Sequence, residues 1–539
     1  MSRLKNRKKS SSSLGIGAAL VVLATTISIS GCASTPSAND GNPGTGSTAP
    51  SGTINAWVYS GPSSFNPALA AGVQTFQFDR QLFDTVLRRD DKGLVGGLAS
   101  VWTAKSASDY TFTIRDGATC SDGSPITATV VANSLKYLAS PTTGSTWRAL
   151  VFGQGVPTIT ADDKSSIVHI ALSKPFANLG QGLTVAQTGI ICPAGLSDLE
   201  GLKAGSVKGA YSGPYELTES KPGLSYLLTF RKDYTAWPKF ATPLGGHPAN
   251  LIRYTLGTDE STTANQMLAG QIDFANYADW NTIARFKGND QFHQTEITAY
   301  TTYIIFNERK GRIFADRPDL RKAVAQSIDQ NAFNTVFSHG HSALLTSIVP
   351  KTYQCVNTDK SLLTSPDPAA AKKALSVITG MKLLGNSANV SFSNGADYLY
   401  AALTGAGAKV KMTKLDNATY WSTLADGKSD WDVTFIGDQN TAQTISASLD
   451  RVIGPSVEEN GRNFSGSVNV TGETALQEGL SITDPIKRCA AFETAQRTLF
   501  ERNDVVPLVG GTTVTISSVN VTARRFGEDV DAATLRLVK

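Results

Sequence analysis

Short alternations of apolar and polar residues, bounded by glycine, proline or polar turn residues, recur along most of the chain. Such alternation predicts strands whose two faces differ in burial. The first predicted strand begins at Thr53 and ends at the turn Ser60-Gly61-Pro62. Further strands are predicted at 110–115, 167–172, 224–230, 251–256, 302–306, 409–415, 431–436 and 512–519.

Between these strands, apolar residues recur at spacings of three and four, which predicts amphipathic helices. Thr127 and Asp329 are placed to cap two of them, and Asp367-Pro368 and Asp484-Pro485 each put a capping carboxylate before a first-turn proline. The helix expected from Pro485 carries on one face Cys489, Phe492, Gln496 and Leu499. Strands that alternate with helices predict α/β lobes with mixed sheets.

The first 31 residues have the layout of a secretion signal. A basic patch at 3–9 precedes an apolar run from Leu14 to Ile29, and Ser30-Gly31-Cys32 follows. The small pair before a cysteine resembles a bacterial lipobox, which implies cleavage after residue 31 and a diacylglycerol on the thiol of Cys32. The run of about 16 residues is short for a transmembrane helix, which needs about 20. We therefore expect attachment to the outer face of the bacterial cell membrane through the lipid anchor only.

Removal of residues 1–31 changes the charge of the 539-residue chain from +4 to −1, because the five charged residues of that segment are all basic. A balanced surface gives no reason to expect nucleic acid as a partner. Residues 32–52 are rich in glycine, proline, serine and threonine, which predicts a flexible tether after the lipidated cysteine. The rest is long enough for two or three domains.

Four cysteines remain beside Cys32, an even number that predicts two disulfides in an oxidising compartment. Three pairings are possible. We favour Cys120–Cys192 and Cys355–Cys489, because each pair then lies within one half of the chain. Free buried thiols are the alternative.

The motifs of common catalytic and cofactor sites are absent from the sequence. There is no Walker-type phosphate loop, no G-x-S-x-G elbow and no H-E-x-x-H. His339-Gly-His341 has no cysteine or carboxylate nearby to complete a metal site. We therefore expect no catalytic residues, no cofactor, no metal and no enzymatic activity.

Several segments, taken in order, resemble the extracellular solute-binding proteins of ABC importers, family 5, which includes the oligopeptide- and dipeptide-binding proteins. They span about 450 residues and comprise FDTVLRRD (83–90), GLASVW (97–102), YTFTIRDG (110–117), SDGSPITA (121–128), GPYEL (213–217), GQIDF (270–274), IFN (305–307) and LRKAVAQSID (320–329). Asp122-Gly123 suits a tight turn, so these motifs mark the fold rather than ligand contacts.

The resemblance implies a periplasmic-binding-protein-like II fold, with two lobes joined by a two-strand hinge. Lobe I would comprise 53–298 and 505–539, with an extra subdomain at about 82–188, and lobe II would comprise 299–504. The ligand, a short peptide or another small molecule, would bind in the cleft, and the lobes would close over it and present it to a membrane permease. We expect a monomer.

In peptide-binding relatives, a carboxylate after a strand of lobe II binds the α-ammonium group of the ligand. Trp431–Asn440 is similar to that segment, which makes Asp438 the candidate, although Thr441-Ala442 replaces the expected acidic residue and proline. Other cleft candidates, named from their positions near the predicted strand ends and hinge, are Tyr59, Ser60, Phe65, Asn66, Tyr300, Tyr303, Phe435 and Gln439.

Two other functions remain open. An oligosaccharide or metal-chelate receptor would have the same fold, and sugar binding would use Trp57, Trp147, Trp237 or Trp421 for stacking rather than Asp438. A secreted hydrolase or a cell-wall interaction protein would belong to a different class.

Overall fold

The computed structural model describes residues 51–459, 461–526 and 529–538. The signal segment, Cys32 and most of the tether lie outside these residues. Within the described ranges, no helix combines the length and the apolar character needed to cross a membrane.

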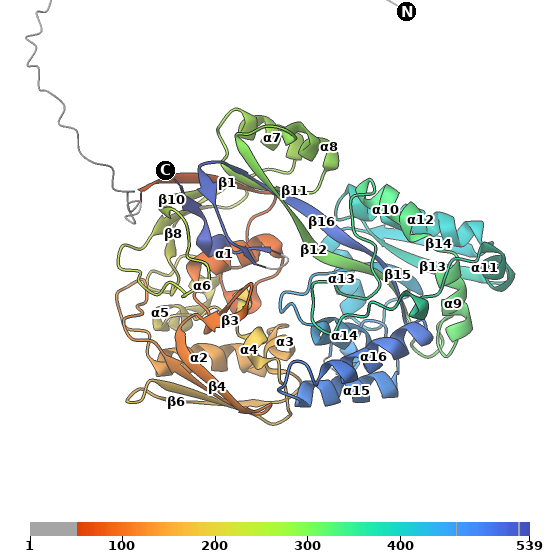
Figure 1. Ribbon diagram of the computed structural model, residues 1–539, viewed down its shortest axis with the longest axis horizontal. Helices are drawn as coiled ribbons and strands as arrows, with labels where there is room; N and C mark the ends of the chain where they lie inside the picture. The colour runs from red at the N-terminus through yellow and green to blue at the C-terminus, as the bar shows by residue number, and fades with distance from the viewer. Residues whose placement is uncertain (1–50, 460, 527–528, 539) are drawn as a thin grey trace, which may run out of the picture. The chain divides into compact units, whose positions relative to one another are not determined.

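A twelve-stranded mixed sheet runs through the protein (Figure 1). In spatial order its strands are β14 (Lys409–Leu415), β13 (Thr379–Asn386), β15 (Val433–Asp438), β12 (Phe292–Phe306), β16 (Val505–Ser518), β11 (Phe274–Tyr277), β1 (Ser51–Val58), β10 (His247–Leu256), β20 (Arg536–Leu537) and β17 (Val521–Thr522). In addition, β9 (Ser225–Phe230) pairs with β10, and β8 (Tyr215–Lys221) pairs with β9. The pairs β1–β10 and β13–β14 are parallel, whereas β12 is antiparallel to both neighbours. Strand β1 begins two residues before Thr53.

Two long antiparallel strands, β12 and β16, link the two parts of this sheet (Figure 1). The second half of β12, from Thr301, pairs with β15, whereas the second half of β16, from Val514, pairs with β11. Their register shifts between Thr298 and Tyr300, where the strands pass from one part to the other. The α/β class with two lobes and a two-strand connection is therefore confirmed.

The predicted extra subdomain contains a separate antiparallel sheet. Its strands are β4 (Ala99–Ser106), β5 (Asp109–Ile114), β7 (Ile167–Leu172) and β6 (Pro157–Asp162), in that order, and α2 packs on β6 and β7. The hairpin β2 (Leu87–Asp90) and β3 (Gly93–Gly96) precedes it, and the small pair β18 (Arg525–Phe526) and β19 (Asp529–Val530) lies near the C-terminus.

Three of the four helix starts predicted from capping residues are correct. Within the predicted bounds of lobe I lie α1 (Val73–Leu82), α2 (Ala128–Ala139), α3 (Arg148–Phe152), α4 (Leu179–Gly182), α5 (Pro193–Ser197), α6 (Leu199–Ala204), α7 (Glu260–Leu268) and α8 (Trp280–Ile283). Within those of lobe II lie α9 (Pro318–Gln326), α10 (Gln330–Ser338), α11 (Pro368–Leu375), α12 (Val390–Gly405), α13 (Asn417–Ala425), α14 (Ile445–Ile453), α15 (Val470–Ser481) and α16 (Cys489–Glu501).

Side chains of Thr127, Asp329 and Asp367 accept hydrogen bonds from backbone N–H groups at the starts of α2, α10 and α11, as predicted. The start of α16 was predicted wrongly. This helix begins at Cys489 rather than Pro485, although the Asp484 carboxylate still accepts from the N–H groups of Ile486 and Lys487. A capped turn therefore precedes the helix without continuing into it.

Both predicted disulfides are present. Cys120–Cys192 ties the start of the α2 region to the start of α5, and Cys355–Cys489 ties a loop of lobe II to the start of α16. Cys120 and Cys192 are fully buried, whereas Cys355 and Cys489 are partly exposed.

Candidate ligand-binding site

A cavity of about 50 Å³ lies where the two lobes face each other. Lobe I contributes Phe76, Gln77 and Arg80 of α1, together with 185–187 and the C-terminal residues Val530 and Asp531. Lobe II contributes 439–441 and Gln443, directly after β15, and Ala299 lies at the register shift of β12. The site is therefore assembled from segments that are far apart in the sequence.

Helix α1 holds one wall of this cavity. Phe76 and Arg80 are four residues apart and so lie on one face of the helix. Phe76 packs edge-on against Trp147, whose Nε1 donates to the Ala70 carbonyl. Arg80 Nη2 donates to the Thr184 carbonyl at 2.7 Å, which fixes α1 against the segment that carries Gln187.

Asp438, the predicted ammonium-binding residue, ends β15 and is 1% exposed. Its Oδ1 lies 2.7 Å from Nε of Arg451, and its Oδ2 accepts hydrogen bonds from Ser448 Oγ at 2.6 Å and Tyr303 OH at 3.1 Å. Burial and the adjacent carboxylate raise the pKa of the Tyr303 phenol well above its usual value, so this hydroxyl remains a donor. The carboxylate is thus paired within lobe II, and its contact with a ligand stays a prediction.

The remaining candidates occupy different environments. Gln439 lines the cavity, and Tyr303 reaches Asp438 beside it. Tyr59 and Ser60 are exposed, whereas Phe65 is buried against Phe78 and Tyr226. Asn66 caps a 3₁₀ turn and donates to Tyr137 OH. Phe435 stacks on Phe392, which also contacts Tyr300. Of the predicted residues, only Gln439 lines the cavity, and Asp438, its neighbour in the chain, is bonded to Tyr303.

The four tryptophans considered for sugar stacking pack against aromatic residues of the protein. Trp57 stacks on Tyr277, Trp147 meets Phe76, Trp237 stacks on Phe230, and Trp421 meets Tyr420. Each is buried or half-buried. None of them lines the cavity, although Phe76 does.

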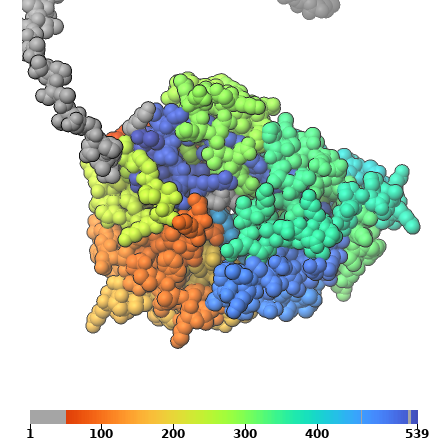
Figure 2. Space-filling model, in the orientation of Figure 1, coloured from red at the N-terminus to blue at the C-terminus, as the bar shows by residue number. Residues whose placement is uncertain are grey.

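Direct contacts join the lobes around the cavity. Arg89 Nη1 donates to Gln443 Oε1 at 2.9 Å. Asn178 Nδ2 donates to Ser446 Oγ at 2.5 Å, and Asn178 Oδ1 accepts from Arg488 Nη1 at 2.7 Å. The Ala177 N–H donates to the Leu480 carbonyl, and on the face shown in Figure 2 the orange and yellow residues touch the blue ones. The lobes are thus in direct contact beside the cavity.

A second contact between the lobes lies near the hinge. The indole of Trp280 stacks on the imidazole of His341, with centroids 3.8 Å apart. His341 belongs to the His-Gly-His segment considered above, and its neighbour His339 ends α10 in a left-handed conformation. This segment therefore has a packing role between α8 and the loop after α10.

Near the cavity, Arg88 is paired with a carboxylate, and burial raises the pKa of two other carboxyl groups. Arg88 forms an ion pair with Oδ2 of Asp531. Burial raises the pKa of Asp84, next to Arg88, to about 6, and Tyr234 OH donates to it at 2.9 Å. Burial also raises the pKa of Asp79 in α1 well above its usual range.

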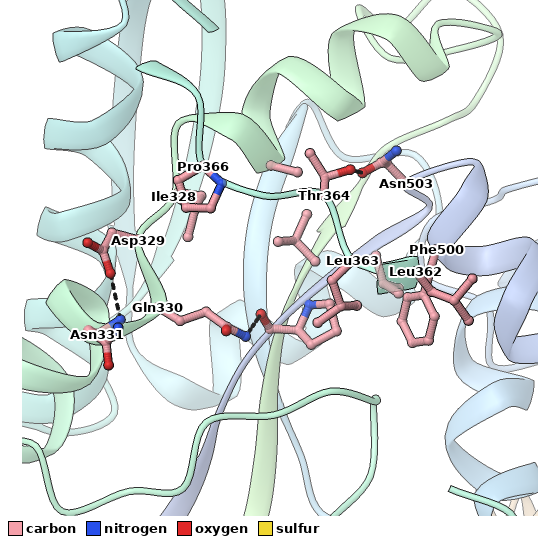
Figure 3. Close-up of a pocket in the computed structure, with 14 residues that line it drawn as sticks. Ile328, Asp329, Gln330, Asn331, Leu362, Leu363, Thr364, Pro366, Phe500 and Asn503 are labelled. Atoms are coloured by element: carbon pink, nitrogen blue, oxygen red, sulfur yellow. Dashed lines mark hydrogen bonds between the residues drawn. The ribbon is translucent and has the colours of Figure 1, made fainter. Parts of the chain in front are cut away.

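A larger cavity, of about 170 Å³, lies between residues 325–331, 362–366 and 500–507 (Figure 3). Several of its polar side chains are already paired. Gln330 Nε2 donates to the Pro507 carbonyl at 2.7 Å, Asp329 caps the next helix, and Thr364 Oγ1 donates to Asn503 Oδ1. Because the smaller cavity between the lobes is lined by a buried amide without a hydrogen-bond partner among the described residues, it is the better candidate.

The sequence prediction missed most of the cavity lining. Only weak sequence patterns indicated that Arg80 and Gln187 line a site. Arg80 follows a phenylalanine by four residues, and Gln187 belongs to a Gln-Thr pair within the apolar stretch 183–191. Asp531 comes from the C-terminal segment, which reaches the site only through long-range packing. A polar residue within an apolar stretch is a usable signal, since burial requires it to have a partner.

The chain is similar to proteins of a known family. Residues 93–449 match the family described as bacterial extracellular solute-binding proteins, family 5 Middle. The chain belongs to this family. A substrate binding protein from Microbacterium hydrocarbonoxydans, solved in complex with 4-hydroxybenzoate hydrazide, is 37% identical with a TM-score of 0.81, and the match covers 90% of this chain and 100% of that one.

Two relatives from Escherichia coli strain K12 are more distant. The periplasmic murein peptide-binding protein MppA is 28% identical over 52% of this chain, and the probable D,D-dipeptide-binding periplasmic protein DdpA is 27% identical over 64%. The matches span 55% and 65% of those relatives, less than two thirds of their length.

Proposed function

We propose that this protein is the extracytoplasmic receptor of an ABC importer, held at the outer face of the cell membrane by a lipid on Cys32. It captures a small solute, foremost a short peptide, between its lobes and delivers it to the permease. The observation that supports this proposal most directly is the cavity between the lobes, with α1 and Gln187 on one side and 439–443 on the other.

Ligand entry requires the lobes to part. The cavity of about 50 Å³ is far smaller than the roughly 300–1,000 Å³ of pockets that bind small molecules. The hydrogen bonds Arg89–Gln443 and Asn178–Ser446 would have to open for a peptide to enter. A ligand that contacts both walls favours the closed form by its differential affinity, which gives the permease a shape to recognise.

The relatives support an acyl–nitrogen ligand. Two are named for murein peptides and D,D-dipeptides, and a third was solved with a hydrazide. Peptides and hydrazides share a planar carbonyl bonded to an N–H. The amide-rich lining, with Gln77, Gln187, Gln439, Asn440 and Gln443, suits such a group.

Native mass spectrometry of protein purified from its own host tests the ligand class. We expect a bound mass that corresponds to a short peptide or an acyl hydrazide, and a thermal shift when that compound is added back. A bound oligosaccharide or metal chelate would instead identify another receptor of the same fold. Turnover of peptides during incubation would contradict the proposal that the protein is not an enzyme.

Fractionation of cells tests the anchor. Replacement of Cys32 by serine should move the protein from the membrane fraction into the soluble extracytoplasmic fraction, because the acyl chains are then lost. A Cys32→Ser variant that stays with the membrane would contradict lipidation at this residue.

A further inference from the structure

The side chain of Gln187 is buried, with 1% exposure, and lines the cavity between the lobes. Within the described residues, neither Oε1 nor Nε2 of its amide has a hydrogen-bond partner. A buried polar group without a partner is destabilising, because the hydrogen bonds it made to water are not replaced. The donor and the acceptor of this amide both lack a partner, so the same conclusion holds if its oxygen and nitrogen are exchanged.

The position of Gln187 is fixed by its surroundings. It lies in the 3₁₀ turn Ala186–Thr188, where Thr188 Oγ1 donates to the Val185 carbonyl at 2.8 Å. The bond from Arg80 to the Thr184 carbonyl holds this turn against α1. The open amide is therefore presented by a rigid turn, which suits ligand recognition.

Two other groups of the lining also lack hydrogen-bond partners among the described residues. They are Oδ1 of Asp531, which can only accept, and the hydroxyl of Thr441 on the opposite lobe. The rest of the lining combines the apolar residues Phe76, Val185, Ala186, Ala299 and Val530 with Arg80 and four amide side chains, Gln77, Gln439, Asn440 and Gln443. A ligand group that forms hydrogen bonds with Gln187, Asp531 and Thr441 together has several N–H donors and one acceptor close together.

The carboxylates near the cavity do not require a ligand cation. Asp531 is paired with Arg88, and Asp438 with Arg451. A ligand ammonium at either carboxylate would compete with an arginine that is already in place. A neutral group that offers N–H donors meets no such competition.

We propose that Gln187 binds a neutral carboxamide or hydrazide group of the ligand through a paired donor and acceptor. The N–H groups of the ligand then point toward Asp531. This inference rests on the proposed function and specifies its substrate class: amides, hydrazides and peptides in which an amide group, rather than the α-ammonium, enters this cavity.

Calorimetric titration of the purified protein tests the group that is recognised. The probes are 4-hydroxybenzoate hydrazide, 4-hydroxybenzylamine and 4-hydroxybenzoate, which share a ring and carry a neutral, a cationic and an anionic group. Trialanine and N-acetyl-trialanine form a second pair. We expect the hydrazide to bind at least tenfold more tightly than the amine or the acid, and the acetylated peptide to bind as well as the free one.

Variants test the role of Gln187. Gln187→Met keeps the shape without the polar atoms, and should weaken hydrazide binding at least tenfold while the melting temperature of the ligand-free protein stays the same or rises, because an open buried amide is removed. If Gln187→Met does not fold, Gln187→Glu replaces the N–H donor with an acceptor at the same length and gives the same comparison. Unchanged affinity in the variant overturns the inference.

The outcomes also separate this inference from the receptor function. Binding of trialanine alone, with no binding of its acetylated form or of the hydrazide, would overturn the role of Gln187 and leave the receptor function intact. Failure of every probe, together with no change in small-angle scattering on addition of any of them, would count against both.

Discussion

Nε of Arg451 lies 2.7 Å from Oδ1 of Asp438, and both residues belong to lobe II. The Asp438 carboxylate, which resembles the ammonium-binding group of peptide receptors, therefore has an intramolecular counterion. Breaking a buried ion pair by removing one partner leaves the other charge uncompensated. The ion pair therefore bears on the stability of the ligand-free protein.

Asp438→Asn should lower the free energy of unfolding by about 3 kcal/mol in the absence of ligand, because Arg451 then lacks its counterion. Chemical denaturation measures this change. Addition of Arg451→Met to the same chain should recover most of the loss, since the charge left without its partner is then removed as well. Full stability of the single variant would indicate that the ion pair contributes little and that Asp438 is free to bind a ligand ammonium.

The cluster Glu308, Arg321 and Asp504 in lobe II predicts a pH-dependent stability. Burial and the Asp504 carboxylate raise the pKa of Glu308 from 4.5 to about 8, despite Arg321, whose Nη1 lies 2.9 Å from Glu308 Oε2. The folded protein therefore binds more protons than the unfolded chain between these two values. The stabilisation is complete below pH 4.5 and is lost as the pH rises to about 8.

Glu308→Gln should flatten this part of the pH profile. The slope removed is at most about 1.4 kcal/mol per pH unit, and the difference should be clearest above pH 6, where the contribution of Asp84, with a pKa of about 6, has ended. Denaturation midpoints from pH 5 to 8 measure it. Parallel profiles for the two proteins would show that Glu308 does not carry the effect.

The disulfides should differ in their access to reductant. Cys120 and Cys192 are fully buried, and Cys355 and Cys489 are partly exposed, so mild reduction should open Cys355–Cys489 first. Alkylation of the free thiols followed by peptide mapping gives the order. Labelling of Cys120 before Cys355 would contradict this prediction.

Asn178 contacts two residues of the opposite lobe, Ser446 and Arg488. Asn178→Ala removes both hydrogen bonds and should speed ligand release about tenfold, which corresponds to about 1.4 kcal/mol of lost closed-state stability. Stopped-flow displacement measures the rate, and small-angle scattering should show a larger radius of gyration without ligand.

The matched control for Asn178 is Asn394→Ala. Asn394 is only partly buried, and its amide donates to the Val336 carbonyl within lobe II. This variant should leave both the release rate and the radius unchanged. Equal effects of the two substitutions would mean that the contact between the lobes does not control release.

Short-range patterns account for much of the fold. The alternation at 167–172 and 409–415 matches β7 and β14 residue for residue, and Thr127, Asp329 and Asp367 cap helices as their positions indicated. In contrast, only 302–306 of the fifteen-residue strand β12 was predicted, because its first half is rich in polar residues and is held by pairing with β16. Local patterning cannot report a strand that depends on a distant partner.

By itself, the sequence determined the local elements, the even set of cysteines that form two disulfides, and the order of motifs that identifies the family. Only the tertiary structure decided that Asp438 is paired with Arg451 and that the open amide of Gln187 lines the same cavity as 439–441 and Gln443. The physical reason is distance along the chain. Caps and alternation are set by neighbours within a few residues, whereas this cavity is assembled by long-range packing of α1, 185–187, 439–443 and 530–531.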